Sequence, residues 1–596
     1  MTPADDAAAE LTAGVRDPRY APRSLEAERR PDGSLLLTNP RPVTGAFATT
    51  LGPLEHWADR DPNRMWLAER SGEGWRELSY GEGRAQVRAI AGGLAGLGLE
   101  RGAPVLILAR NGIDVALFTY AVMSRGLIAA PVSPQYGLPG ADLSRLAHAV
   151  ELVRPAALFV EDADAFAEAL DAPFVAGLPV IAARNPRPGH IALDALRRGP
   201  ATAAVARPDD IARLLLTSGS TGEPKAVICL HANIAHNGAQ IAGCYDDPDP
   251  PLVVNQAPWS HSLGATAILH MLTHRGGSLW IDAGQPAPGR FAETVRNLRE
   301  FAPTYHNMVP AGWDLLADEL ERDKALARRF FSRLRVMQYG GAALGQSTAA
   351  RIQTVALRTV GEKISFSSGY GATETGPTAT NVHWPNETMG LIGLPLPGTS
   401  VKLAPVGEKL EFRVKGPQVS PGYYRAPEAS RAAFDEEGFY RLGDAARPVD
   451  PRRLELGLVF DGRLSENFKL ASGAFVNAGA LRVAALSAMG GAARDAVVCG
   501  EGQSGVGLLI FRNQAVDPLA AAKVIRAGLT RFNAEAKGGG GRVARALIVA
   551  DQPDPASGEI TDKGYINQTK ARARRGGDIA RLFATAPDAD VINLEA

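Results

Sequence analysis

A run of glycine and hydroxyl residues follows three leucines near residue 217. Residues 214–227 read LLLTSGSTGEPKAV, and the six residues from Thr217 to Gly222 are all Gly, Ser or Thr. Successive backbone N–H groups in such a turn form a concavity that binds anions, and hydroxyls add donors. Lys225 adds a mobile positive charge. The segment predicts a phosphate-binding loop after a strand, with a solvated Ser/Gly loop as the alternative.

The spacing of this loop differs from that of a Walker A sequence, which requires Gly-x-x-x-x-Gly-Lys-Ser/Thr. In its order of residues the loop resembles the phosphate loop of adenylate-forming enzymes, a superfamily of acyl-CoA synthetases, luciferases and the adenylation domains of peptide synthetases. Four later segments resemble motifs of the same superfamily: SGYGATETGP (368–377), YRLGDAAR (440–447), DGRLSENFK (461–469) and ITDKGYINQ (560–568). Leu442 stands where the second of these motifs has a threonine.

The resemblance implies that a carboxylic acid attacks the α-phosphorus of ATP, and that ATP, Mg²⁺ and CoA are used. Because both reactants are anions, positive charge and positioning must overcome their repulsion. The implied ATP- and AMP-binding residues are Thr217, Ser218, Gly219, Ser220, Thr221, Gly222, Lys225, Gly341, Ala342, Ala343, Tyr370, Gly371, Asp444 and Arg463. Tyr370 would stack on adenine, and Asp444 would accept both ribose hydroxyls.

Four residues are implied as catalytic. Glu374 would hold the magnesium ion, since Mg²⁺ prefers hard oxygen ligands. Thr373 would donate to the α-phosphate, and His261, in APWSHSLG, would lie beside the acyl carboxylate. Lys563 would bridge carboxylate and α-phosphate oxygens and stabilise the transition state. The alternative for Glu374 and Asp444 is a solvated loop carboxylate, and for Lys563 a surface charge.

A second step, thioester formation, needs different groups around the same acyl-AMP. The resemblance implies that a small C-terminal domain rotates about a hinge at Ser465, where a small polar residue can absorb a backbone change. Lys469 and Gly473 would then border the CoA site. The expected domains are an N-terminal ATP- and acid-binding domain (1–462), a hinge (463–466) and a C-terminal lid domain that carries the catalytic lysine (467–596).

The subgroup that the chain resembles most is the bacterial feruloyl-CoA synthetases, and segments such as NGIDVALF, APVSPQYGL and ENFKLASGAFVNAGALRV carry this resemblance. It implies a hydroxycinnamate, feruloyl-like substrate, whose phenol would meet Tyr305 or His306 in the acyl pocket. SLGATAILH after His261, YHNMVPAGW (305–313) and YGATETG depart from the subgroup pattern. Another aryl acid or a medium-chain acid therefore stays open, as does a core position for His306.

The elements that must position these residues follow from the apolar runs. Short apolar strands at 104–110, 127–134, 156–162 and 213–220 alternate with helical patterns, which predicts α/β architecture with largely parallel sheets. The stretch 114–134 is too interrupted to cross a bilayer and predicts a buried helix followed by a strand. The resemblance adds a large N-terminal domain with mixed sheets and a small, mobile α/β C-terminal domain.

Composition bounds the remaining possibilities. The 596 residues include 64 Lys+Arg and 64 Asp+Glu, so that neither a nucleic-acid footprint nor a polybasic membrane surface is implied. Three cysteines without paired spacing favour a reducing, cytoplasmic compartment. We expect small-molecule partners only (a carboxylic acid, ATP and CoA) and a monomer or homodimer. A ligase that loads a carrier protein and a nucleotide-binding pseudoenzyme are the other function classes, although no GxxS-type carrier site is evident.

Overall fold

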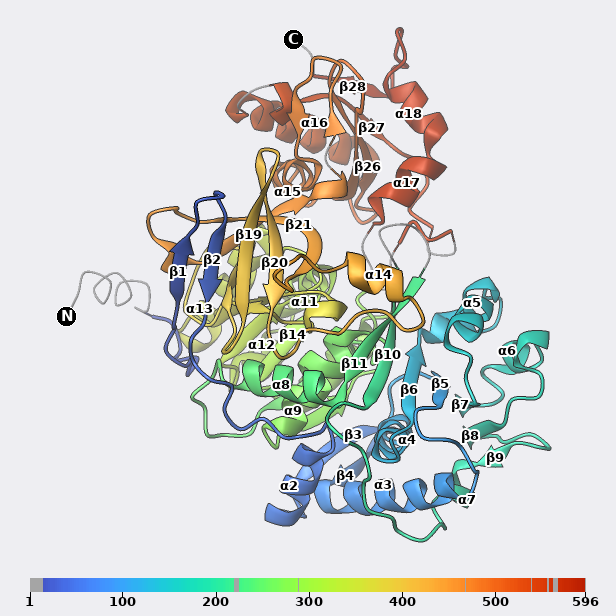
Figure 1. The fold of residues 1–596 in the computed structure, drawn as a ribbon. Coiled ribbons are helices and arrows are strands. Elements are labelled where there is room, and N and C mark those ends of the chain that lie inside the picture. Colours follow the sequence, from blue (N-terminus) through green and yellow to red (C-terminus); the bar gives the residue numbers. More distant parts are fainter. Residues whose placement is uncertain are drawn as a thin grey trace.

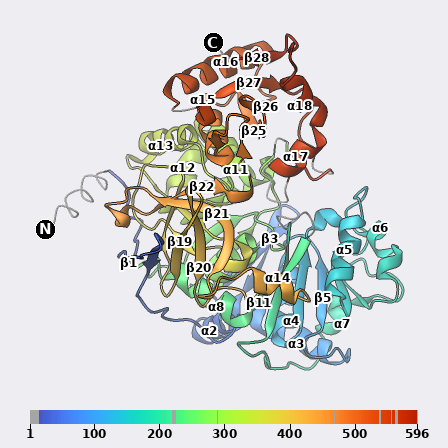
Figure 2. The same ribbon diagram turned by 45° about the horizontal axis from the view of Figure 1, so that its top comes forward.

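The chain folds into a large N-terminal body of three sheets and a smaller C-terminal unit that sits on top of it (Figure 1). The computed structural model describes residues 14–218, 224–287, 289–466, 468–536, 539–554, 557–560 and 566–594. Turning the molecule brings the smaller unit forward, above the strands that carry the candidate site (Figure 2). This mixed α/β architecture of a large and a small domain confirms the predicted fold class.

The seven-stranded sheet carries the strand that leads into the Gly/Ser/Thr run. Its order is β11-β10-β6-β5-β7-β8-β9, and all neighbours are parallel except β10 and β11. Its strands are β5 (Pro104–Leu108), β6 (Ile128–Val132), β7 (Ala157–Asp162), β8 (Val180–Arg184), β9 (Ile191–Ala192), β10 (Ile211–Ser218) and β11 (Pro224–Leu230). Every residue of β5 and β6 is buried, as expected for a parallel sheet covered on both faces. The four predicted strands are confirmed, the last of them as far as Ser218.

The eleven-stranded sheet differs from the largely parallel arrangement expected from the sequence. Its order is β1-β2-β19-β20-β21-β22-β18-β17-β16-β15-β14, and only β14, β15 and β16 pair in parallel. The strands are β1 (Glu26–Arg29), β2 (Leu35–Thr38), β14 (Tyr305–Met308), β15 (Val336–Tyr339), β16 (Ser365–Tyr370), β17 (Thr380–Asn381), β18 (Leu391–Pro395), β19 (Ser400–Val406), β20 (Lys409–Lys415), β21 (Tyr440–Pro448) and β22 (Leu458–Arg463). The two-residue turn between β19 and β20 contains Gly407 at φ +60°, a conformation that closes tight antiparallel hairpins.

A third sheet of four strands completes the N-terminal body. Its order is β12-β13-β3-β4, formed by β3 (Met65–Ser71), β4 (Gly74–Ser79), β12 (Leu252–Asn255) and β13 (Ser278–Ile281). The helices of this body are α2 (Gly52–Arg60), α3 (Tyr80–Ala95), α4 (Ile113–Ser124), α5 (Ser144–Val153), α6 (Ala167–Leu170), α7 (Leu193–Leu196), α8 (His231–Ala242), the π-helix η3 (Leu263–His270), α9 (Met271–His274), α10 (Ala292–Glu300), α11 (Pro310–Arg322), α12 (Lys324–Phe331), α13 (Gln346–Val360) and α14 (Pro427–Ala432).

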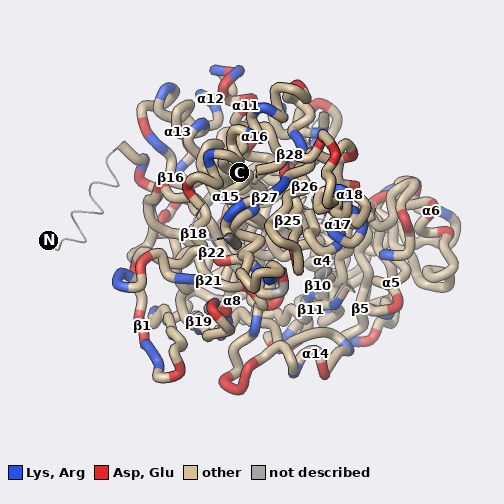
Figure 3. Tube along the Cα trace, turned by 90° about the horizontal axis from the view of Figure 1, so that it is seen from above, with Lys and Arg blue, Asp and Glu red and all other residues tan. Residues whose placement is uncertain are grey.

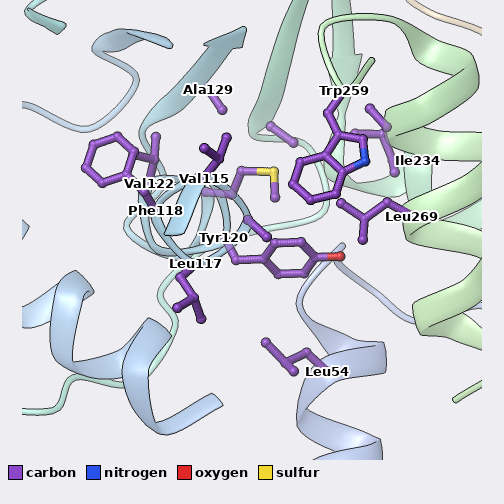
Figure 4. Close-up of a cluster of buried hydrophobic side chains, with 14 of the residues drawn as sticks. Leu54, Val115, Leu117, Phe118, Tyr120, Val122, Ala129, Ile234, Trp259 and Leu269 are labelled. Atoms are coloured by element: carbon purple, nitrogen blue, oxygen red, sulfur yellow. The ribbon is translucent and has the colours of Figure 1, made fainter. Parts of the chain in front are cut away.

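The predicted buried helix within 114–134 is α4, and ten of its twelve residues are buried. Its side chains, among them Phe118 and Tyr120, meet residues of η3 and of the seven-stranded sheet in one apolar cluster (Figure 4). In the part of the chain that the structure describes, no helix combines the length and apolar character needed to cross a bilayer. The site is thus mounted on a rigid core between the sheets.

The C-terminal unit is a four-stranded sheet with helices on it, and it has apolar clusters of its own. The sheet order is β25-β26-β27-β28, with β25 (Ala493–Cys499), β26 (Val506–Arg512), β27 (Val543–Ile548) and β28 (Val591–Asn593). A hairpin of β23 (Phe468–Lys469) and β24 (Phe475–Val476) precedes it, and its helices are α15 (Ala478–Ala488), α16 (Pro518–Glu535), α17 (Gln568–Arg574) and α18 (Gly576–Leu582).

Candidate active site

The Gly/Ser/Thr run connects two antiparallel strands. Thr217 at the end of β10 lies opposite Lys225 in β11, and Ser218 lies opposite Pro224. The hairpin register therefore places the predicted phosphate-binding lysine beside the start of the loop. The predicted residues Gly219, Ser220, Thr221 and Gly222 lie outside the described residues, as does Lys563.

The end of β16 carries the tyrosine of the predicted adenine site. The Tyr370 hydroxyl donates to Oδ2 of Asp444 at 2.5 Å, and Arg463 Nε lies 3.4 Å from Oδ1 of the same carboxylate. Asp444 and Arg463 are cross-strand partners in β21 and β22, which explains why they meet. Burial, with a further contribution from Asp444, raises the pKa of the Tyr370 phenol. Since a carboxylate offers about four lone-pair sites, Asp444 still has acceptor capacity for hydroxyls.

The predicted catalytic histidine and threonine belong to segments that touch each other. Ser262, next to His261, forms a hydrogen bond of 3.2 Å between its Oγ and Oγ1 of Thr373. The two segments are 111 residues apart in the chain, and η3 begins directly after Ser262. Both lie on a small internal cavity of about 20 Å³ that Asn237 and Thr266 also line. The structure thus joins the APWSHSLG and YGATETG segments.

Glu374 is 9% exposed, and its side chain is held by Tyr423, which the sequence reasoning missed. Tyr423 in turn bonds to Tyr440, the first residue of the YRLGDAAR segment. Tyr423 donates its hydroxyl to Oε1 at 3.0 Å, and its oxygen lies 2.7 Å from the hydroxyl of Tyr440. The ammonium group of Lys225 lies 4.9 Å from the centre of the Tyr423 ring. Burial and the nearby Glu374 carboxylate raise the pKa of both phenols. A GYYR tetrapeptide marks Tyr423 in the sequence, but no spacing rule connects it to Glu374.

The donor set around Glu374 fits a magnesium ion bound mainly by substrate. No group of three or more His, Cys, Asp or Glu residues able to hold a metal occurs among the described residues. Protein sites for Mg²⁺ commonly supply one or two carboxylates while phosphates and water supply the other ligands. With Oε1 held by Tyr423, Glu374 offers Oε2 and the second lone pair of Oε1, which suits that arrangement.

The predicted adenine-lining segment follows β15. Gly341 has φ +83°, a left-handed conformation that favours glycine, and Gly341, Ala342 and Ala343 are exposed. Gly371 is required for another reason, because a Cβ there would lie 2.6 Å from the carbonyl oxygen of Gly376. The backbone of 341–343 is thus exposed, whereas Gly371, next to Tyr370, is packed against the Gly376 segment.

The two residues predicted as phenol partners point to opposite faces of β14. Tyr305 belongs to the apolar cluster of the α4 layer, and its hydroxyl donates to Gln338. His306 is 1% exposed and packs edge-on against Trp313 and Phe330, each with ring centroids 5.3 Å away. Burial lowers the pKa of His306 to about 3. Because neighbouring strand residues alternate, the two side chains do not line one common pocket.

The predicted hinge and CoA residues lie where the two units join. Ser465 falls in the short turn η6 (Leu464–Glu466) after β22. Lys469 is exposed in β23, opposite Phe475 of β24. Gly473 has φ +81°, a left-handed conformation that favours glycine. A Cβ would meet no neighbour there, so the backbone conformation and not crowding explains the glycine.

Helix α5 contacts residues that flank the predicted phosphate loop and residues that flank the loop containing Lys563. Nε2 of His148 lies 3.3 Å from the carbonyl oxygen of Pro224, directly after the Gly/Ser/Thr run. A Cβ at Gly558 would lie 2.9 Å from Nη2 of Arg145, and Ile560 pairs with Ile566 across the loop that contains Lys563. One helix therefore contacts the flank of the predicted phosphate loop and the flank of the lysine loop.

Two known family models together match most of the chain. The family model "AMP-binding enzyme" matches residues 54–424, and "AMP-binding enzyme C-terminal domain" matches residues 476–587. A 4-coumarate–CoA ligase-like protein of Oryza sativa is 28% identical over 381 residues, which are 62% of this chain and 64% of that protein. The chain thus spans less than two thirds of that relative's length.

Two further matches cover more of the chain. A salicyl-AMP ligase/salicyl-S-ArCP synthetase of Mycobacterium tuberculosis is 30% identical over 434 residues, or 69% of this chain and 72% of that protein. The crystal structure of an anthranilate CoA ligase in complex with anthranoyl-AMP superposes with a TM-score of 0.74 at 18% identity, covering 90% and 98% of the two chains. At that identity the superposition establishes the fold.

Proposed function

This chain belongs to the AMP-binding enzyme family, and we propose that it is an ATP-dependent acid–CoA ligase. It converts a carboxylic acid and ATP to an acyl-AMP and pyrophosphate, and then transfers the acyl group to CoA with release of AMP. The proposed acid is aromatic, of the hydroxycinnamate (feruloyl-like) type.

One observation carries the proposal: the segment 370–374 contacts two other predicted motif segments directly and, through Tyr423, comes near the lysine of a third. Tyr370 bonds to Asp444, Thr373 bonds to Ser262, and Glu374 bonds to Tyr423, over which Lys225 lies. Asp444 belongs to the eleven-stranded sheet and Lys225 to the seven-stranded sheet, whereas Ser262 and Tyr423 lie outside the strands. Their convergence gives a site with one half suited to a nucleoside and the other to an acid and phosphates.

In the first step each residue has a role that its position allows. Tyr370 would pack on adenine, and Asp444 would accept the ribose hydroxyls, with Arg463 neutralising the carboxylate. Thr373 would donate to the α-phosphate while Ser262 orients its hydroxyl. Lys225 and Lys563 would bring positive charge to the repelling carboxylate and phosphate oxygens. His261 would lie beside the acyl carboxylate.

Glu374, with its carboxylate oriented by Tyr423, is the residue that would hold Mg²⁺. When bound, the ion supplies charge that offsets the phosphate oxygens, as it does in other phosphoryl-transfer sites.

For the second step we propose the domain division 1–462, 463–466 and 467–596, with rotation about Ser465. Since α5 contacts both Pro224 and the Gly558 segment, we propose that adenylation uses this orientation of the two units. After rotation, Lys469 and Gly473 would border CoA instead.

The acid is proposed from the resemblance to feruloyl-CoA synthetases and from relatives named as 4-coumarate–CoA ligases. A buried phenol without a partner costs about 1–3 kcal/mol, so a hydroxycinnamate pocket must provide one. Replacing His306 by Phe tests that role. A KM increase for ferulate that exceeds the increase for cinnamate would assign His306 to the phenol, and equal increases would leave it as a core residue.

The function is tested with purified protein, Mg²⁺, ATP and a panel of ferulate, cinnamate, salicylate and octanoate, each with and without CoA. We expect AMP, pyrophosphate and a thioester with ferulate and CoA. Acyl-AMP that accumulates unchanged by CoA would favour a ligase for a carrier protein, as in the salicyl-AMP ligase relative. A preference for octanoate would overturn the aromatic assignment.

A further inference from the structure

A buried arginine lies behind the acid side of the candidate site. Arg213 in β10 is 2% exposed and is among the largest fully buried side chains of the chain. The acidic groups near it are the Tyr120 phenol and the Cys229 thiol, and because burial raises the pKa of both, they stay protonated and do not neutralise the guanidinium. Burial lowers the pKa of the guanidinium. Taking such an ion out of water costs several kcal/mol, which an apolar side chain of equal size would avoid.

A strand irregularity aims this side chain at the helical layer. The register of β10 against β11 shifts between Ile211 and Arg213, and Arg213 is the residue that pairs with Ala129 of β6. An extra residue in a strand re-aims the side chains next to it. Tyr120, Ala129, Trp259 and Leu269 belong to the apolar cluster of this layer (Figure 4). The bond of Arg213 to Ala265, a member of the same cluster, places the guanidinium against it.

The guanidinium bonds to the first turn of the π-helix η3. Nη1 of Arg213 donates to the carbonyl oxygen of Ala265 at 3.1 Å, and the amide of Ala265 donates to the carbonyl oxygen of His261 at 2.9 Å. One residue, Ala265, thus links the buried cation to the backbone of the predicted catalytic histidine. π-Helical turns are rare and are frequently found at functional sites.

The same turn is constrained on its other sides. A Cβ at Gly264 would lie 2.4 Å from the carbonyl oxygen of Pro258, and Asn111 holds that loop by bonding to Ala257 and to the amide of Trp259. The contacts with residues 257–259 fix one side of the turn 261–265. The bond from Ser262 to Thr373 fixes the side that faces the predicted nucleotide site. Arg213 supplies the remaining support, from the core.

We propose that Arg213 is a positioning residue for recognition of the acyl carboxylate. Its bond to Ala265 fixes the start of the turn 261–265, and through it the imidazole of His261. The inference rests on the proposed function, and it predicts that Arg213 affects binding of the acid while ATP binding stays as in the parent.

The test compares Arg213→Met, which keeps the side-chain volume, with Arg213→Lys, which keeps the charge. We expect Arg213→Met to raise KM for the acid in pyrophosphate exchange by roughly tenfold, equivalent to ~1.4 kcal/mol, the low end for a bond to a charged group. The Kd for ATP should change less than about twofold, well within 1 kcal/mol. The KM of Arg213→Lys for the acid should lie between that of the parent and that of Arg213→Met. A matched control is Thr273→Val, further along the same helical run: Thr273 of α9 donates to Leu269 of η3 and accepts from Trp66, and the change removes both buried bonds.

Hydrogen exchange provides a readout that is independent of activity. In Arg213→Met, amides of residues 258–266 should exchange faster than in the parent, while those of 478–488 stay unchanged. If Arg213→Met does not fold, the same measurement on Arg213→Lys decides. Unchanged exchange in this turn, or equal losses for acid and ATP, would overturn the inference. A parent protein without acid-dependent exchange of pyrophosphate would refute the proposed function, whereas the amide data would still decide whether Arg213 holds the turn.

Discussion

At the scale of single residues, the site depends on side chains that no motif identifies. Tyr423 orients Glu374 at 3.0 Å and places its ring under Lys225 at 4.9 Å, so that one residue serves both charged groups. A carboxylate fixed in this way loses less conformational freedom when it binds a cation, which is the advantage of a preorganised ligand.

We therefore expect Tyr423→Phe to weaken magnesium binding more than it weakens folding. The change removes one hydroxyl and keeps the ring beneath Lys225. The Mg²⁺ concentration for half-maximal activity should rise about 10-fold or more, as for other supporting residues of metal ligands. Titration of Mg²⁺ at saturating ATP measures this rise. Tyr424→Phe, the next residue along, is the matched control, and equal effects of the two changes would remove Tyr423 from this role.

At the scale of elements, the joint between the two units is a short turn supported by specific contacts. Asp461 accepts from Lys409 at 2.7 Å and from Asn477 at 2.9 Å, and Asn477 begins α15. A Cβ at Gly479 would lie 3.1 Å from Gly462, so the helix start packs directly on β22. The bond between Asn477 and Asp461 joins the two units and holds their orientation. Rotation at Ser465 would have to break it.

Ser465→Pro should separate the two half-reactions. Proline fixes φ near −65° and removes a backbone donor, so the turn η6 loses its freedom to rotate. We expect pyrophosphate release in the first turnover to persist and thioester formation to collapse. Rapid-quench measurement of both products in one experiment checks this expectation. Steady-state thioester synthesis at the parent rate would show that the pivot lies elsewhere.

The sequence predicted those elements whose signal is local. The strands of the seven-stranded sheet and helix α4 follow from continuous apolar runs, and Asp444 and Arg463 were both named from their motifs. The antiparallel majority of the eleven-stranded sheet was missed, because pairing between β2 and β19, over 350 residues apart, leaves no local pattern. That Tyr305 and His306 point to opposite faces could be predicted only if 305–308 were already known to be a strand, because neighbouring side chains alternate in a strand.

At the scale of the whole molecule, charge is balanced and spread. Lys, Arg, Asp and Glu intermingle over the face seen from above, in keeping with equal numbers of both signs (Figure 3). Several histidines are nevertheless buried within the N-terminal body. Burial lowers the pKa of His231, His274 and His383 to about 4 and that of His306 to about 3.

These histidines predict loss of stability in mild acid. Their folded pKa lies below the unfolded value of about 6.5, so the unfolded chain binds more protons between the two values. Stability should be complete above about pH 6.5 and should fall toward pH 4, by up to ~1.4 kcal/mol per pH unit for each histidine. Thermal unfolding between pH 7.5 and 5 measures the effect. His306→Phe should reduce the slope, and a Tm that is constant over this range would contradict the account.

The central claim is that the chain forms an acyl-AMP with Lys563 as the transition-state charge partner. Acid-dependent exchange of labelled pyrophosphate into ATP, by the parent and by Lys563→Ala, tests it most directly. The account predicts exchange with ferulate by the parent and a loss of about 10²–10³-fold in the variant, typical of one removed charge-stabilising group. Thioester formation from supplied feruloyl-AMP should persist in the variant. Exchange that is absent from the parent with every acid, or that is unchanged in Lys563→Ala, would contradict the account.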